Sequence, residues 1–319
     1  MAHPRHATGA VLALTLLVAS AALNTTGSAA AASATHPNGT GVTLPANGKI
    51  AFVRSNQIYT ANSTGTGVKA LTSGDRNFAP AYSRDGTQIA YIHKVNGKQD
   101  LWIMKSDGTA KKRITTTGTV NGLAWSPDGQ WLAFGSPLQE VRTVAPYDVH
   151  PILGTYCSSG PVPLEPLGHL AWSPNGQYIV FPTYEGCDSP SYYFVSLDLA
   201  TGNVVDLAEV GGACCGYGYY ENPAFSSDSK LLAYDYVWQT NPTNPLGPPA
   251  VQLTTFPSQG AVSYPPHPSD TQPVFAPNDQ YLLFANYATG IGKIWRADLN
   301  GTHRTLITTG YDPTWQPLP

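Results

Sequence analysis

A short phrase recurs along this chain, and its spacing constrains the fold more than any other feature. The phrase runs from a small residue or proline through an apolar and an aromatic residue to a turn, and an apolar strand follows. Its clearest copy is Leu123–Gly129 (LAWSPDG), followed by Trp131–Phe134 (WLAF). The aromatic residues stand at positions 82, 125, 172, 225, 275 and 315, so 43, 47, 53, 50 and 40 residues separate them. That interval is the period of a four-stranded propeller blade.

The turn within the phrase explains why each copy forms a hairpin. Proline presets φ, aspartate hydrogen-bonds its own backbone and glycine accepts a positive φ, so Ser-Pro-Asp-Gly reverses the chain tightly. A third strand follows in most copies, as at Leu101–Met104, and a further turn leads to a fourth, as at Lys112–Thr115. The strands are almost continuously apolar, which is typical of sheets buried on both faces.

The two ends of the repeat region complement each other. Lys49–Phe52 (KIAF) is a second-strand sequence without a first strand before it, and Pro313–Trp315 is a first-strand phrase without a second strand after it. Five internal copies and one composite copy predict an all-β, six-bladed propeller of four-stranded blades, closed by a C-terminal strand that completes the first blade. Such closure removes two exposed sheet edges. An all-β sandwich explains neither the period nor the complementary ends.

The repeat resembles the TolB-like, or WD40-like, β-propeller repeat. The resemblance rests on the Ser-Pro-Asp-Gly turn, the Ile-Ala-Phe or Ile-Ala-Tyr strand, and the Asp-Gly turn before Lys-Arg-Ile-Thr, and it covers residues 49–319. It implies the fold more specifically than the function, since the family includes scaffolds, substrate-gating domains of peptidases and lyases. TolB itself adds an α/β domain, and prolyl-oligopeptidase relatives add a hydrolase domain. We expect neither domain here, so neither activity is expected to transfer whole.

The first 34 residues are predicted to be a signal peptide. Arg5 precedes the apolar run Val11–Leu23, and a tract of small residues follows at 28–34, the order that export signals share. The apolar run has 13 residues, whereas a membrane-spanning helix needs about 20. We therefore expect cleavage after Ala32 or Ala34 rather than a retained anchor.

Residues 35–48 are rich in glycine, threonine, proline and asparagine, a composition typical of a flexible linker. The propeller is expected to occupy residues 49–319. With the leader removed, the chain is expected to be secreted or to lie in the extracytoplasmic cell envelope, monomeric and not inserted in a membrane.

Composition and charge exclude several classes of protein. The 31 glycines and 28 prolines argue against a coiled coil or helical bundle. The formal charge is −3 and the longest basic run is Lys111–Arg113, so no nucleic-acid partner is expected. The sequence has no G-x-S-x-G elbow and no H-E-x-x-H pair, so neither a nucleophilic serine nor a local metal motif is predicted. We expect no cofactor and no metal.

The best candidate site is the face that carries the links between blades. Residues just before each aromatic phrase enter an innermost strand, and each comes from a different blade, so they are expected to ring the mouth of the central channel. Most are polar and tyrosines lie close in sequence, which predicts a polar pocket with aromatic walls. The candidates are Arg76, Asn77, Asn121, His169, Glu221, Asn222, Gln272 and Asp312. The alternative is that the mouth is polar only because water fills it.

Two insertions interrupt the repeat, at residues 136–168 and 240–266, and both are rich in proline. Because proline cannot donate to a sheet ladder, we expect these segments to be loops or sheet edges.

Four cysteines, Cys157, Cys187, Cys214 and Cys215, are disulfide candidates, since an even number in an exported protein favours bridges. We expect Cys187 to pair with one of the vicinal pair 214–215 and Cys157 to pair with the other. The rival is a vicinal 214–215 bridge together with 157–187.

Together these features predict an exported, non-catalytic propeller that acts as a binding or protein-interaction module through its channel face. Its partner would be a protein or a glycan at the cell envelope, which the sequence does not identify. The alternative is an extracellular glycan-active enzyme, a hydrolase or a lyase, with its site at the channel mouth. That enzyme would use Glu221 or Asp312 with His169, and two carboxyl groups about 5–10 Å apart would favour glycoside hydrolysis.

Overall fold

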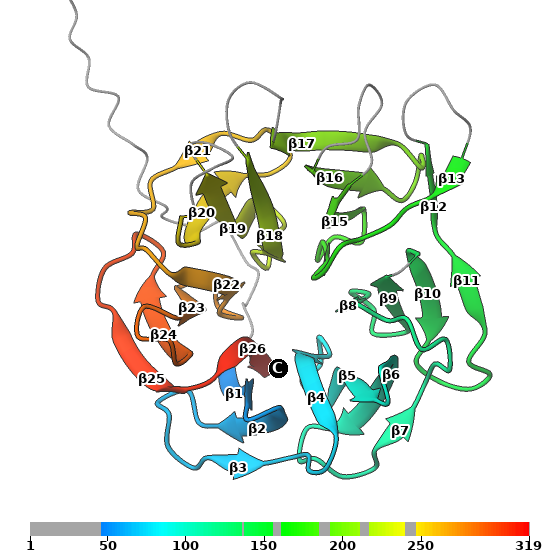
Figure 1. Cartoon of the computed structure of the whole chain (residues 1–319), viewed down its shortest axis with the longest axis horizontal. Helices are drawn as coiled ribbons and strands as arrows, with labels where there is room; N and C mark the ends of the chain where they lie inside the picture. Colours follow the sequence, from blue (N-terminus) through cyan, green and yellow to red (C-terminus); the bar gives the residue numbers. More distant parts are fainter. Residues whose placement is uncertain are drawn as a thin grey trace, which may run out of the picture. The chain divides into compact units, whose positions relative to one another are not determined.

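The computed structural model describes residues 46–135, 137–155, 161–184, 192–210, 217–239 and 247–318. Within these ranges the regular structure consists of β-strands, arranged as six four-stranded sheets in a ring (Figure 1). This confirms the predicted all-β, six-bladed propeller. No helix that could cross a membrane occurs in the described part of the chain. The predicted signal peptide, linker residues 35–45 and all four cysteines lie outside the described residues.

The strands of each blade run in order from the channel outwards. Blade 1 contains β26 (Tyr311–Leu318), β1 (Ala46–Arg54), β2 (Gln57–Ala61) and β3 (Lys69–Ala70). Blade 2 contains β4 (Arg76–Tyr82), β5 (Gln88–Val95), β6 (Lys98–Lys105) and β7 (Lys112–Arg113). Blade 3 contains β8 (Gly122–Trp125), β9 (Trp131–Gly135), β10 (Gln139–Arg142) and β11 (Val149–Pro151).

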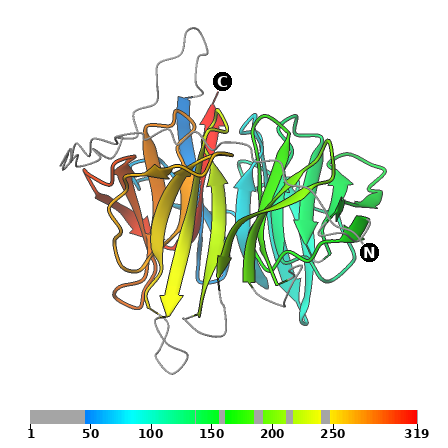
Figure 2. The same ribbon diagram turned by 90° about the horizontal axis from the view of Figure 1, so that it is seen from above.

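The remaining blades follow the same order. Blade 4 contains β14 (Ala171–Trp172), β15 (Tyr178–Thr183), β16 (Tyr192–Asp198) and β17 (Val204–Val210). Blade 5 contains β18 (Tyr217–Phe225), β19 (Leu231–Gln239), β20 (Ala250–Thr255) and β21 (Ala261–Val262). Blade 6 contains β22 (Asp270–Phe275), β23 (Tyr281–Asn286), β24 (Lys293–Asp298) and β25 (Thr305–Thr309). Figure 2 shows the strands from the side, where they run along the axis of the ring.

The ring closes as the sequence predicts, because β26 supplies the innermost strand of blade 1. It pairs antiparallel with β1, with Ile50 opposite Trp315 and Ala51 opposite Thr314. The indole Nε1 of Trp315 donates to the carbonyl oxygen of Gly48 at 3.3 Å. The two ends of the propeller are therefore held together without a covalent bond between them.

The turns between first and second strands are held by the residues that the repeat supplies. In blade 3, Ser126 Oγ donates to Asp128 Oδ1 at 2.5 Å and accepts from the Trp131 backbone N–H at 2.9 Å. Asp128 also accepts from the Gln130 N–H at 3.0 Å. The serines at 83, 173 and 226 make the same pair of contacts in their own turns. Each side-chain pair replaces backbone hydrogen bonds that a chain reversal interrupts.

The hydrophobic core lies between neighbouring blades rather than at the centre of the ring. One cluster joins Ile92 and Leu101 of blade 2 to Leu132 and Phe134 of blade 3. Across that interface Trp125 Nε1 donates to the Ala81 carbonyl oxygen at 3.0 Å. Both faces of each sheet are covered in this way, which accounts for the continuous apolar strands.

The expectation that the insertions form only loops or edges was wrong for β10 and β20, which are the third strands of blades 3 and 5. Neither strand contains a proline, because the prolines of the insertions flank these paired residues instead of interrupting them. In the first insertion β11 forms the outer edge of blade 3. The strands β12 (Leu153–Thr155) and β13 (Pro161–Pro163) form a separate hairpin.

Candidate functional site

The residues three positions before the aromatic anchors lie together at one end of the channel. These residues are Ala79, Gly122, His169, Asn222, Gln272 and Asp312. All but Gly122 line a channel cavity of about 330 Å³. The opposite end is lined by the residues two positions after each anchor, namely Arg84, Pro127, Pro174, Ser227, Pro277 and Pro317. The channel is therefore polar at one mouth and mostly proline-lined at the other.

A β-bulge places the polar side chains at this mouth. The register of the innermost strand shifts at Ala79, Asn222, Gln272 and Asp312, and each of these residues has a positive φ, between 47° and 56°. Asparagine and aspartate tolerate that conformation better than most residues. A bulge changes the direction of a side chain relative to its strand, and a proline follows each of these four bulged residues.

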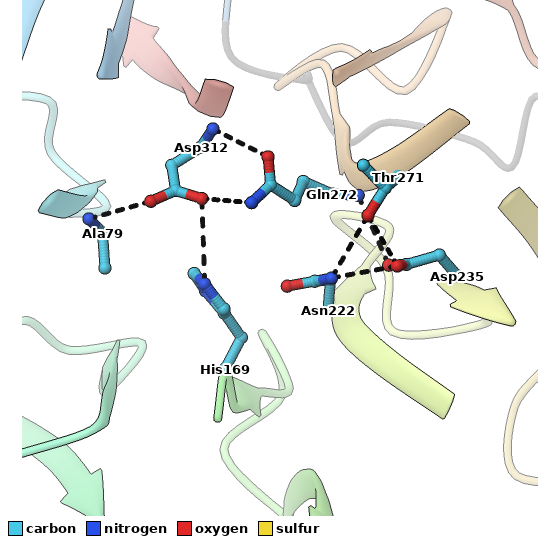
Figure 3. A network of polar contacts seen from close by, with 7 residues as sticks. All are labelled: Ala79, His169, Asn222, Asp235, Thr271, Gln272 and Asp312. Atoms are coloured by element: carbon cyan, nitrogen blue, oxygen red, sulfur yellow. Dashed lines mark hydrogen bonds and ion pairs between the residues drawn. The ribbon is translucent and has the colours of Figure 1, made fainter. Parts of the chain in front are cut away.

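Asp312 is the centre of one hydrogen-bond network (Figure 3). Its Oδ2 accepts from the Ala79 N–H at 3.2 Å, and its own N–H donates to Gln272 Oε1 at 2.9 Å. Gln272 Nε2 donates back to Asp312 Oδ1. His169 Nε2 lies 3.9 Å from the same Oδ1. Asp312 is 8% exposed as a side chain, whereas His169 is 39% exposed, so the imidazole stands above a buried carboxylate.

Asp235 of β19 is the centre of a second network, which sequence reasoning missed. It accepts hydrogen bonds from Thr271 Oγ1 at 2.6 Å, from Asn222 Nδ2 at 3.0 Å and from the Gln272 backbone N–H at 3.3 Å. Burial raises the pKa of its carboxyl group to about 7, although the hydrogen bonds from Thr271 and Asn222 act in the opposite direction. The signal that could have found it is a single carboxylate inside the otherwise apolar run LLAYDYVW.

Glu221 lies beside this mouth without lining the channel cavity. The residue is exposed, yet protein atoms around its carboxyl group raise the pKa above its ordinary value by desolvation, and His169 partly offsets that effect. His169 therefore has a carboxylate neighbour in blade 5 as well as Asp312 in blade 1.

Tyrosines flank both carboxylates. Burial raises the pKa of Tyr219, with a further contribution from Glu221. Burial also raises the pKa of Tyr287 and of Tyr311, and the charge of Asp312 adds to both effects. Tyr287 was not among the sequence candidates. Tyr220, which lies close in sequence, packs instead against the rings of Phe194 and Tyr236.

Three sequence candidates have other surroundings. Asn77 is 2% exposed and donates to Gln57 Oε1 at 3.0 Å, which ties blade 2 to blade 1. Asn121 donates to the Pro166 carbonyl oxygen at 2.7 Å. Arg76 places its guanidinium carbon 4.8 Å from the centre of the Phe78 ring and partly offsets the raised pKa of Tyr311. None of the three lines the channel. Within the described ranges, no three His, Cys, Asp or Glu side chains are grouped as metal ligands.

Comparisons with known proteins agree with this fold. Residues 108–137 match the family described as WD domain, G-beta repeat. Dipeptidyl-peptidase 5 of Porphyromonas endodontalis is 34% identical over 85 residues, which cover 26% of this chain and 12% of that protein. The Tol-Pal system protein TolB of Desulfosudis oleivorans is 39% identical over 51 residues, which cover 16% of this chain and 12% of that protein. The chain thus matches only about an eighth of either relative's length.

Solved structures extend the likeness to most of the chain. TolB from Acinetobacter baumannii superposes with a TM-score of 0.68 at 19% identity, over 86% of this chain and 68% of that one. The periplasmic gluconolactonase PpgL of Pseudomonas aeruginosa gives 0.51 at 13% identity, over 85% and 99%. An oligogalacturonate lyase in complex with manganese gives 0.51 at 14% identity, over 84% and 73%. At these identities the likeness establishes the fold.

The fold and the repeat define a six-bladed β-propeller with WD40-like blades. In fold and repeat the chain is similar to the TolB-like, WD40-like propellers, as its turn and strand phrases predict.

Proposed function

We propose that this protein is an exported binding module that holds a ligand or partner protein at the polar mouth of its channel. The observation that carries the proposal is the convergence of His169, Asn222, Gln272 and Asp312, from four different blades, on one cavity. Gln272 and Asp312 are fixed by hydrogen bonds between blades 6 and 1, and Asn222 is fixed by a hydrogen bond to Asp235 of its own blade. A site whose groups are already ordered loses little conformational entropy when it binds.

Export and an interaction role have separate support. The predicted leader and the likeness to a periplasmic gluconolactonase support a location outside the cytoplasm. The likeness to TolB supports a module that binds other proteins. The amide and carboxylate of Gln272 and Asp312 bond to each other, which suits a rigid wall better than a pair of reacting groups.

A second candidate is an enzyme acting on a glycan or lactone at the same mouth. One observation favours it: His169 lies near the buried Asp312 and near Glu221, whose raised pKa suits a general acid. A lyase and a lactonase share the fold. In this alternative Glu221 would donate a proton and His169 would accept one.

A thermal-shift screen of the secreted protein against peptides, glycans, lactones and divalent cations tests both candidates. A ligand at 100 times its Kd stabilises the folded state by about 2.7 kcal/mol, which raises Tm by several degrees. We expect one ligand class to shift Tm, and we expect Asn222→Ala to abolish that shift. Glu140→Gln is the matched control, since Glu140 lies on β10 away from the channel.

Product analysis by mass spectrometry separates the candidates. Ligand recovered intact after prolonged incubation supports the binding module. Turnover that is lost in Glu221→Gln supports the enzyme. If Tm shifts persist unchanged in His169→Ala and Asn222→Ala, the channel mouth is not the site.

A further inference from the structure

The orientation of Asn222 is fixed by its surroundings, and this determines what the channel mouth offers to a ligand. Its Nδ2 donates to the carboxylate of Asp235 at 3.0 Å. A carboxylate accepts hydrogen bonds and an amide nitrogen donates them, so the amide oxygen must point the other way. Figure 3 shows that oxygen directed away from Asp235, towards His169. Asn222 is 9% exposed.

The Asn222 oxygen has no hydrogen-bond partner among the described residues, whereas both the nitrogen and the oxygen of the Gln272 amide are bonded. Gln272 donates to Asp312 with its nitrogen and accepts from the Asp312 N–H with its oxygen. The mouth therefore contains an acceptor, on a largely buried side chain, that is held in place and left available. The enclosed side-chain atoms without a partner in the described residues do not include this oxygen, so it is accessible to a ligand.

The neighbouring groups are also acceptors. Asp312 Oδ1 lies 3.9 Å from His169 Nε2, and the carboxyl group of Glu221 is close enough to His169 for the imidazole to act on the carboxyl pKa. The tyrosines at 219, 287 and 311 stand beside these carboxylates. Their rings present faces that attract cations. Arg76 of blade 2 is a fixed cation that stacks on Phe78 and lies near Tyr311.

We propose that the channel mouth binds a primary ammonium group, which donates to the Asn222 oxygen and to the carboxylates of Glu221 and Asp312. This deepens the proposed function, on which it rests, by naming the chemistry of the ligand. An ammonium group has three donors and no acceptor, which matches three acceptors that converge around one imidazole. Charge-assisted hydrogen bonds of this kind are stronger than those a neutral sugar hydroxyl would make.

Isothermal titration calorimetry at pH 7, where the terminal amine of a peptide is mostly protonated, tests the proposal with changes made in the ligand alone. The probes are the tripeptide Ala-Ala-Ala, its N-acetyl form and its N-trimethyl form. We expect acetylation, which removes the charge, to weaken binding about tenfold or more. Trimethylation keeps the charge and removes the donors, so it should also weaken binding. N-acetyl-Ala-Lys-amide and spermidine, run in parallel, distinguish a chain terminus from a lysine side chain or a polyamine as the source.

Variants then locate the interaction. The side chain of Glu221 makes no hydrogen bond in the described structure, so Glu221→Gln should fold normally and weaken ammonium binding about fivefold to tenfold. Glu140→Gln makes the same charge change in blade 3 and should leave binding unchanged. His169→Ala should retain binding, because in our proposal the imidazole competes with the ligand for the same acceptors.

Three outcomes overturn the proposal. Acetylated and free peptides could bind equally, His169→Ala could abolish binding, or no amine probe could bind at millimolar concentration. In each case the proposed function stands if the thermal-shift screen finds another ligand whose effect depends on Asn222. It fails separately if no ligand effect depends on the mouth residues.

Discussion

At the scale of single residues, Asp235 determines the arrangement of the channel mouth although it does not line the channel cavity. Its side chain is buried in β19 and accepts three hydrogen bonds, from Asn222, Thr271 and the Gln272 backbone. These bonds hold one bulge of blade 5 and one of blade 6. The cost is a carboxyl group removed from water, which is why its pKa is raised to about 7.

Asp235→Asn is expected to change how stability depends on pH. The pKa of Asp235 is about 7 in the folded protein, whereas the ordinary value for an aspartate is 3.8, so folding favours its protonated form. The stability that this protonation contributes is present below about pH 4 and is lost as pH rises through about 7. The free energy of unfolding of the wild type, relative to Asp235→Asn, should therefore fall by about 2–4 kcal/mol over that range. Urea unfolding at several pH values measures it.

Asp128→Asn is the control with the opposite sign. Its carboxyl pKa is lowered, chiefly by the hydrogen bond from Ser126, so the stability it contributes is lost as pH falls. If the difference in free energy of unfolding between the wild type and Asp235→Asn did not change with pH, burial would not control the ionisation of Asp235.

At the scale of elements, the turn between first and second strands is the repeated unit of construction. The serine that opens the turn bonds both the acidic or amide residue two positions later and the backbone N–H five positions later. Both bonds are local in sequence, so each blade can form its hairpin independently of the others.

Ser126→Ala should destabilise the protein by about 1–2 kcal/mol, because it removes two hydrogen bonds from a buried side chain. Urea unfolding followed by circular dichroism measures the loss. Ser106→Ala is the control, because the Ser106 side chain makes no hydrogen bond within the described structure. This substitution should destabilise the protein by about 0.5 kcal/mol or less. Equal effects at the two sites would contradict the role assigned to Ser126.

At the scale of the whole molecule, the ring depends on the contact between β26 and β1. Trp315 is 4% exposed and packs with Ile50 and Phe52 in the core of this closing blade. This interface joins the two ends of the described propeller. Both the Trp315 indole and the backbone of β26 are hydrogen-bonded to β1 across it.

Trp315→Ala should therefore cost about 3–5 kcal/mol, and Trp315→Phe should cost about 1–2 kcal/mol, since the ring is kept and one hydrogen bond is lost. Chemical denaturation measures both. Leu306→Ala on the exposed side of β25 is the control and should be nearly neutral. A Trp315→Ala variant as stable as Leu306→Ala would mean that the closing strand contributes little to the ring.

Export and cysteine pairing are also properties of the whole molecule, and they remain predictions from sequence. Intact-mass analysis of the secreted protein should find an N-terminus at position 33 or 35. A non-reducing peptide map should join Cys187 to one cysteine of 214–215 and Cys157 to the other. A vicinal 214–215 bridge would select the rival pairing, and an uncleaved leader would contradict export by this signal.

The blade number, the hairpin turns and the closing strand were all predictable from the sequence. Each depends on short-range signals that recur, such as the Ser-Pro-Asp-Gly turn and the aromatic anchor, and every blade meets its neighbours in the same way. Repetition makes a weak local signal reliable. The position of β20 was not predictable, because proline content does not reveal which residues between the prolines pair.

The candidate site was only partly predictable. Candidates three positions before an anchor, such as His169 and Asp312, line the channel, whereas those four to six positions before it, such as Asn77 and Asn121, do not. In four of the six innermost strands the difference arises from a bulge, whose positive φ redirects one residue, and no composition rule reports that. The participation of Asp235 depended on contacts between blades 5 and 6.

By itself, the sequence determined the propeller, because period and turn chemistry are local properties repeated along the chain. Only the tertiary structure decided which polar groups meet at the channel mouth and which of their atoms stay available. Convergence of side chains from four blades is a property of the closed ring, and the direction of the Asn222 oxygen follows from a buried carboxylate in the neighbouring strand.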